Sequence, residues 1–142
     1  QKNIGYLFRT AAAFRVAKIC LWGITAKPPH REIHKTALGA TESVDWEYFE
    51  HTLDAVLKMK KEGYKMVAVE QMDKSIQLKQ YRPKGNEKIA LIFGNEINGV
   101  SDEIIPEVDV CIEIPQFGTK HSFNIAVSAG IVLWHLFIST NE

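Results

Sequence analysis

The stretch from Ile89 to Phe137 constrains the fold most strongly, because it holds one pattern twice. In its first half, an apolar run over residues 89–93 ends abruptly in Gly94 and a polar turn. Ser101 follows a few residues later, and the acidic residues after it are typical of the start of a helix. This half therefore predicts a buried strand, a glycine-bearing loop and a short helix.

The second half of the stretch repeats this order of elements. Residues 108–114 form another strand-like run, which Pro115 stops. A loop from Gln116 to His121 leads to a last helix from about Ile125 to Leu136. Each loop follows the carboxyl end of a strand, which is where open α/β sheets bind ligands. The two loops are therefore the first candidates for a binding site.

The rest of the chain also alternates strands and helices. Residues 3–5 have the composition of a loop, and the periodicity predicts strands at 16–24, 43–49 and 64–69, helices at 6–14, 31–38 and from 53 until Gly63, and a short strand or turn around Ile76. This alternation predicts an α/β fold with a mainly parallel sheet flanked by helices. A length of 142 residues predicts a single domain with a substantial core.

The formal charge is balanced overall but is unevenly distributed along the chain. Residues 1–88 carry 16 Lys and Arg against 10 Asp and Glu, a net +6, and residues 89–142 carry 1 against 7, a net −6. A basic region around Arg9 suits a polyanion such as RNA, because phosphate contacts supply much of the affinity for nucleic acids. The alternative is an ordinary solvated, lysine-rich surface.

Composition also predicts the compartment. No apolar run reaches the roughly 18 residues of a membrane span, and the amino terminus lacks a signal-peptide layout. Cys20 and Cys111 lie in apolar strand-like runs, which predicts buried, reduced thiols in a cytoplasmic protein. His30 and His34 are spaced like two metal ligands, but no third ligand is evident, so no metal is expected.

Three ordered segments resemble the motifs of one known family. Residues 93–101, and residues 112–116 together with 122–128, resemble motifs two and three of the SpoU/TrmH branch of the SPOUT methyltransferases. Asn3 to Gly5, followed by Phe8 to Ala11, resembles motif one. Members of this family transfer a methyl group from S-adenosylmethionine to ribose 2′-hydroxyls of tRNA or rRNA. The resemblance spans nearly the whole chain, and it implies a carboxyl-terminal deep trefoil knot and a homodimer.

The resemblance also implies a catalytic set, which consists of Arg9, Asn3, Glu96 and Asn124. A guanidinium group is effectively always protonated and makes a poor base. Arg9 is therefore better suited to anchor a phosphate and to stabilise the developing alkoxide. The proton acceptor stays open between a phosphate oxygen, water and a transiently deprotonated arginine. Each asparagine has an alternative role in orienting a backbone turn, and Glu96 has one in favouring the next helix.

The cofactor is expected at the loops after Val69, Phe93 and Ile114. The residues that the resemblance places around S-adenosylmethionine, with S-adenosylhomocysteine as the product, are Val69, Glu70, Gly94, Asn95, Ile114, Pro115, Gln116, Ser122 and Phe123. Gly94 would let the backbone approach the ligand closely. Ser122 has a second role open to it, as the cap of the last helix.

The last helix, residues 125–137, is apolar on nearly every side, which predicts burial all round with a partner subunit as part of the cover. In the family a strand precedes the position of Asn3; this sequence is expected to lack that strand, and another segment is expected to cover the sheet edge. Ala12 departs from the family pattern, in which an acid is frequent at this position.

Two rival functions stay open. One is that of a non-catalytic RNA-binding relative, and the other is that of a generic nucleotide-binding α/β domain.

Overall fold

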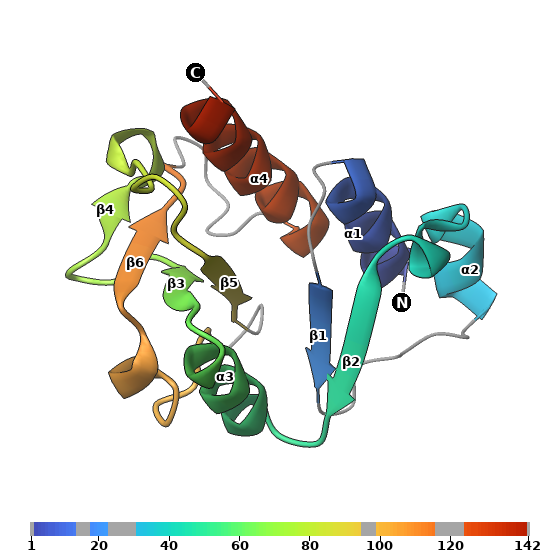
Figure 1. The fold of residues 1–142 in the computed structure, drawn as a ribbon, viewed down its shortest axis with the longest axis horizontal. Helices are drawn as coiled ribbons and strands as arrows, with labels where there is room; N and C mark the ends of the chain where they lie inside the picture. The colour runs from blue at the N-terminus through green and yellow to red at the C-terminus, as the bar shows by residue number, and fades with distance from the viewer. Residues whose placement is uncertain (1, 14–17, 23–30, 95–98, 116–123, 142) are drawn as a thin grey trace. The chain divides into compact units, whose positions relative to one another are not determined.

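The computed structural model describes residues 2–13, 18–22, 31–94, 99–115 and 124–141 (Figure 1). The chain groups into two compact units. Unit 1 comprises Gln1–Ala55 and Asn124–Trp134, and unit 2 comprises Val56–Phe123 and His135–Glu142. The single domain expected from chain length stays a prediction, and each unit is described by itself below.

Unit 1 contains a two-stranded parallel sheet with helices beside it. Its elements are α1 (Lys2–Ala13), β1 (Lys18–Trp22), α2 (Arg31–Ala37), η1 (Ala40–Glu42), β2 (Asp45–Phe49) and the start of α3 (Thr52–Lys61). The strands pair from Lys18↔Asp45 to Trp22↔Phe49. Between them, Lys18 Nζ lies 2.6 Å from Glu47 Oε1. This pairing confirms the two predicted strands, and the second begins two residues later than predicted.

Helix α1 begins earlier than the sequence predicts. It starts at Lys2, so Asn3, Ile4 and Gly5 are helical, and the prediction of a loop there is wrong. Glycine costs a helix interior about 1 kcal/mol relative to alanine. Gly5 and Ala11 are buried, and α1 packs against α2 and η1. Packing of an apolar face therefore outweighs the weak local propensity.

Unit 2 contains a four-stranded parallel sheet with the order β4-β6-β3-β5. Its elements after α3 are β3 (Lys65–Val69), β4 (Ile76–Gln77), η2 (Leu78–Gln80), β5 (Ile89–Phe93), η3 (Ile105–Glu107) and β6 (Val110–Glu113). The central strand β3 buries Met66, Val67 and Ala68 consecutively. A continuous apolar run is typical of a parallel strand that is covered on both faces. These strands confirm the predictions for residues 64–69, 89–93 and 108–114, and of the short strand or turn predicted around Ile76 the structure has the strand.

The predicted helix after Ser101 is a turn followed by the 3-10 helix η3. The Ser101 carbonyl accepts hydrogen bonds from Ile104 N at 3.0 Å and Ile105 N at 3.3 Å. Ile104 is buried, and Pro106, which has no N–H to donate, lies inside η3. The segment therefore makes one tight turn and passes directly into β6.

The last helix, α4 (Ile125–Asn141), is longer than predicted and is not covered on all sides within this chain. Ala129 and Val132 are buried, whereas Val127, Trp134 and Phe137 are 52%, 57% and 40% exposed. Trp134 was expected in the core or at an interface; its exposure excludes the core of this chain, and the interface stays a prediction. None of the helices in the described ranges is long and apolar enough to cross a membrane.

Both cysteines lie in strands, as predicted, but they are half-buried and not fully buried. Cys20 belongs to β1 and Cys111 to β6. Strand β1 is one edge of a two-stranded sheet, and Cys111 lies one residue before the fully buried Ile112. The alternation of side chains between the two faces of a strand explains this difference between neighbouring residues.

Candidate functional site

The carboxyl ends of three strands of unit 2 meet at one edge of its sheet. Val69 of β3 pairs with Phe93 of β5 on one side and with Ile112 of β6 on the other. Residues just after these strand ends are therefore brought together from three parts of the sequence. Five of the expected cofactor residues lie in this group, namely Val69, Glu70, Gly94, Ile114 and Pro115, and each of them is half-buried.

Glu70 connects the three strand ends through hydrogen bonds. Its backbone N donates to the Ile112 carbonyl at 3.0 Å. Its Oε1 accepts from Val100 N at 3.2 Å, and its carbonyl accepts from Cys111 Sγ at 3.2 Å. Because Val100 is buried, this carboxylate satisfies a backbone N–H that would be costly to leave unpaired. Within this chain, Glu70 holds Val100 in place.

Gly94 is required by the backbone of its own loop. A Cβ at this position would lie within 2.8 Å of three backbone atoms of Gly99 and Val100. Gly99 has φ +69, and a Cβ there would meet the Glu70 carboxylate. In this structure, the absence of a side chain at Gly94 allows the backbone of Gly99 and Val100 to approach closely. Contact of Gly94 with a ligand stays a prediction.

Sequence reasoning placed Gly99 and Val100 in a motif but did not assign them to the site. A glycine five residues after Gly94 was the available signal, since glycine adopts positive φ readily.

Cys111 was expected only as a core residue, yet its thiol points to the Glu70 carbonyl. Burial, followed by the negative charge of Glu70, raises the pKa of the Cys111 thiol, which favours the protonated form.

The motif-one residues lie in unit 1, on α1. Arg9 is exposed, and so are Tyr6 and Ala13, which share its side of the helix at spacings of three and four residues. Asn3 lies in the first turn of the same helix. An exposed guanidinium group on a regular helix is available to a phosphate.

Asn124 caps the last helix. Its Oδ1 accepts a hydrogen bond from Ala126 N at 2.8 Å, and its carbonyl accepts from Ser128 N at 2.9 Å. This is the geometry of an N-cap, with the side chain satisfying the N–H of the second helical residue. The structure therefore bears out the orienting role that was left open for Asn124, and capping does not exclude a ligand contact.

Five expected site residues lie outside the described residues. They are Glu96, Asn95, Gln116, Ser122 and Phe123. His30 also lies outside them. Among the residues that the structure describes, no group of three or more His, Cys, Asp or Glu side chains could hold a metal ion.

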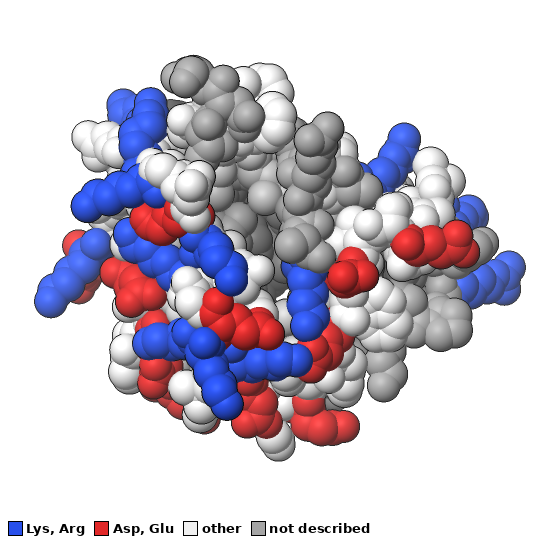
Figure 2. Space-filling model, viewed as in Figure 1, with Lys and Arg blue, Asp and Glu red and all other residues white. Residues whose placement is uncertain are grey.

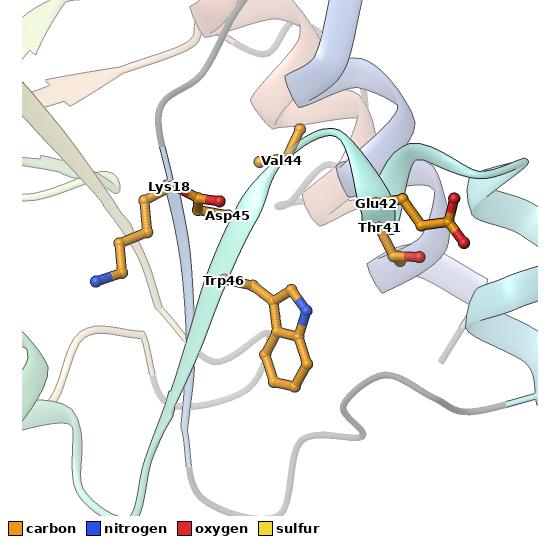
Figure 3. A pocket seen from close by; sticks show the side chains of 6 residues that line it. All are labelled: Lys18, Thr41, Glu42, Val44, Asp45 and Trp46. Carbon is orange, nitrogen blue, oxygen red and sulfur yellow. The ribbon is translucent and has the colours of Figure 1, made fainter.

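A pocket of about 410 Å³ lies in unit 1 and does not include any of the expected site residues (Figure 3). It is lined by Lys18, Thr41, Glu42, Val44, Asp45 and Trp46. Figure 3 shows the Lys18 and Trp46 side chains extending in different directions from β1 and β2. Lys18 is already paired with Glu47. This shallow, polar pocket offers no catalytic constellation.

The chain is similar to one known protein family and to individual members of known function. The model of the SpoU rRNA Methylase family matches residues 1–134. A mouse tRNA (guanosine(18)-2′-O)-methyltransferase, TARBP1, is 34% identical over 133 residues, which cover 93% of this chain and 8% of that protein. A tRNA (guanosine(18)-2′-O)-methyltransferase of Borreliella burgdorferi is 30% identical over 115 residues, which cover 81% of this chain and 52% of that protein.

The fold is similar to that of a solved relative. A crystal structure of an AdoMet-bound rRNA methyltransferase from Sinorhizobium meliloti superposes with a TM-score of 0.85 at 27% identity, and the match covers 94% of this chain and 50% of that one. The present chain thus spans about half the length of these bacterial relatives and under a tenth of the mouse protein.

Proposed function

Because the chain belongs to the SpoU rRNA methylase family, we propose that it transfers a methyl group from S-adenosylmethionine to a ribose 2′-hydroxyl of a tRNA or rRNA. The observation that carries the proposal is the meeting of three strand ends at Val69, Gly94 and Ile114. Strand ends of a parallel α/β sheet are the usual ligand site. The relatives named above are methyltransferases that act on tRNA or rRNA.

The residues at this sheet edge have the chemistry that the cofactor needs. Val69, Ile114 and Pro115 are half-buried and supply apolar surface for an adenine ring. Backbone N–H and C=O groups at the strand ends supply polar contacts, and Gly94 and Glu70 hold the loop that carries them. When bound, the cofactor supplies an electrophilic methyl group and its own leaving group. Asn95, Gln116, Ser122 and Phe123 are proposed to complete the site.

Arg9 is proposed to bind the phosphate next to the reactive ribose and to stabilise the alkoxide that forms when the 2′-hydroxyl loses its proton. Its exposure on α1 supports this role, because a substrate can reach it. Asn3 and Glu96 are proposed to position the substrate beside it. Asn124 is proposed to contribute through the start of α4, which its side chain caps.

We also propose the family's homodimer and its carboxyl-terminal knot for this chain. Val127, Trp134 and Phe137 are large apolar residues exposed along α4, and such a surface is suited to a subunit interface. In such a dimer, Arg9 of one subunit can serve the cofactor site of the other. A cytoplasmic location stays a prediction.

The proposal is tested by calorimetric titration of the purified chain with S-adenosylmethionine, S-adenosylhomocysteine and ATP. Saturable binding of the first two but not of ATP is expected, followed by methyl transfer from labelled cofactor to tRNA or rRNA. Preference for ATP would favour a generic nucleotide-binding domain. Cofactor or RNA binding without methyl transfer to any tested RNA would favour the non-catalytic relative.

A further inference from the structure

A group of basic side chains lies at the same sheet edge as the expected cofactor loops. We propose that Lys74, Lys79 and Arg82, called the basic rim, bind the phosphate backbone of the RNA substrate. The inference rests on the proposed function, because RNA is taken as the substrate. It adds a surface in unit 2 to the motif-one arginine of unit 1.

The topology places the rim beside the carboxyl end of β6. Strand β4 runs parallel to β6, with Ile76 paired to Ile112 and Gln77 to Glu113. Helix η2, which contains Lys79, follows β4 directly. The turn that carries Lys74 is held at the same place, since Ser75 Oγ lies within hydrogen-bond distance of two acceptors, Glu113 Oε1 at 2.9 Å and the Met72 carbonyl oxygen at 2.8 Å. A polyanion that reaches this sheet edge would therefore meet the rim.

Arg82 is held in position by its surroundings. Its Nη1 donates to the Lys79 carbonyl at 2.9 Å and to the Tyr81 carbonyl at 3.0 Å. The same nitrogen lies 2.9 Å from His135 Nε2, which is 2.8 Å from the Tyr81 carbonyl. Among the described residues, the hydrogen-bond contacts of Arg82 all involve Nη1, which leaves the Nε and Nη2 donors for a phosphate. An arginine ordered before binding loses less entropy on binding.

The local charge favours a polyanion. Residues 71–85 contain four Lys and Arg and one acid, Asp73. The nearby Glu70 and Glu113 carboxylates accept hydrogen bonds from Val100 N and Ser75 Oγ. Lys74, Lys79 and Arg82 are all exposed. Figure 2 shows Lys and Arg side chains over the part of the molecule where Figure 1 places β4, with acidic side chains among them.

The test measures binding of a fluorescently labelled tRNA transcript to the full chain at several salt concentrations. The variants are Lys74→Ala, Lys79→Ala, Arg82→Ala and the triple substitution. Log affinity falls as log salt rises, and each lost phosphate contact is expected to make this negative slope shallower by about 0.9. If a variant and the unmodified chain bind RNA equally at 1 M salt, a slope difference of 0.9 corresponds to about eightfold weaker RNA binding by the variant at 0.1 M salt.

The matched control is Lys61→Ala, which removes the same charge from an exposed position at the end of α3. Its RNA affinity is expected to equal that of the unmodified chain. Arg82→Lys keeps the charge but not the guanidinium fork, so an intermediate loss is expected. Lys74 and Lys79 are exposed, so their alanine variants should fold even if Arg82→Ala does not.

The outcomes separate this proposal from the proposed function. Unchanged RNA binding by all rim variants, with methyl transfer by the unmodified chain, would overturn the rim and leave the function standing. Weaker binding by the rim variants, without methyl transfer to any RNA, would support the rim and overturn the methyltransferase activity. A chain that binds no RNA would overturn the rim as well.

Discussion

The two units hold their expected site residues in different ways. In unit 2, Glu70 joins three strand ends through hydrogen bonds to Ile112, Val100 and Cys111. In unit 1, Arg9 stands exposed on a helix surface. The sheet edge proposed to bind the cofactor is therefore preorganised by contacts within this chain, whereas Arg9 is exposed on its helix. We expect Glu70 substitutions to affect cofactor binding and Arg9 substitutions to affect methyl transfer.

The largest effect is expected from Arg9→Ala. Removing a group that stabilises developing charge typically costs about 100-fold to 1,000-fold in rate. The rate of methyl transfer to RNA should fall by at least about 100-fold, while the calorimetric affinity for S-adenosylmethionine stays nearly unchanged. Arg31→Ala, at an exposed position in the same unit, serves as the control and should retain activity. An equal loss of cofactor affinity and activity would remove the contrast between the units.

A smaller effect is expected from Glu70→Ala. This change leaves the buried Val100 N–H without its acceptor, which costs about 1–3 kcal/mol. If that cost falls on the loop proposed to bind the cofactor, S-adenosylmethionine should bind about tenfold more weakly.

Glu70→Gln is the matched control, because its amide oxygen can still accept from Val100 N. It should retain most of the affinity, as measured by the same titration. Normal cofactor affinity in folded Glu70→Ala would show that Glu70 does not position the site.

The smallest effect is expected from Asn124, as a change in stability. Asn124→Ala removes the N-cap of α4 and should lower the free energy of unfolding by about 1 kcal/mol. Asn124→Asp keeps a capping oxygen and should be nearly as stable as the unmodified chain. Urea unfolding measures both values. If the stable Asn124→Asp variant loses methyl transfer, the amide itself takes part in the reaction and α4 capping is only one of its roles.

Part of the fold was predictable because its signals are local. The apolar runs at residues 64–69, 89–93 and 108–114 identified β3, β5 and β6, and a polar or glycine-bearing loop after each identified the sheet edge. The first turn of α1 was not predictable in this way. Its Asn-Ile-Gly sequence has weak helix propensity, and its helical form depends on packing against distant residues.

Charge along the chain was also a poor guide to charge in the folded units. The sequence halves differ by +6 against −6, but unit 1 contains 7 Lys and Arg against 6 Asp and Glu, and unit 2 contains 10 against 11. Chain folding groups segments that are distant in the sequence, so the average along the chain does not describe a surface. A local excess, such as that of residues 71–85, is the quantity that a phosphate backbone would meet.

The sequence by itself determined the family motifs, the alternation of strands and helices, and the residues that follow each strand, because each depends on short-range pattern. Only the tertiary structure decided the order β4-β6-β3-β5, the bond from Val100 N to Glu70 and the place of Lys79 and Arg82 beside β6. Glu70 and Val100 lie 30 residues apart along the chain. The physical reason is that such contacts depend on which strands pair, and strand pairing is selected by burial and hydrogen bonding across the whole sheet.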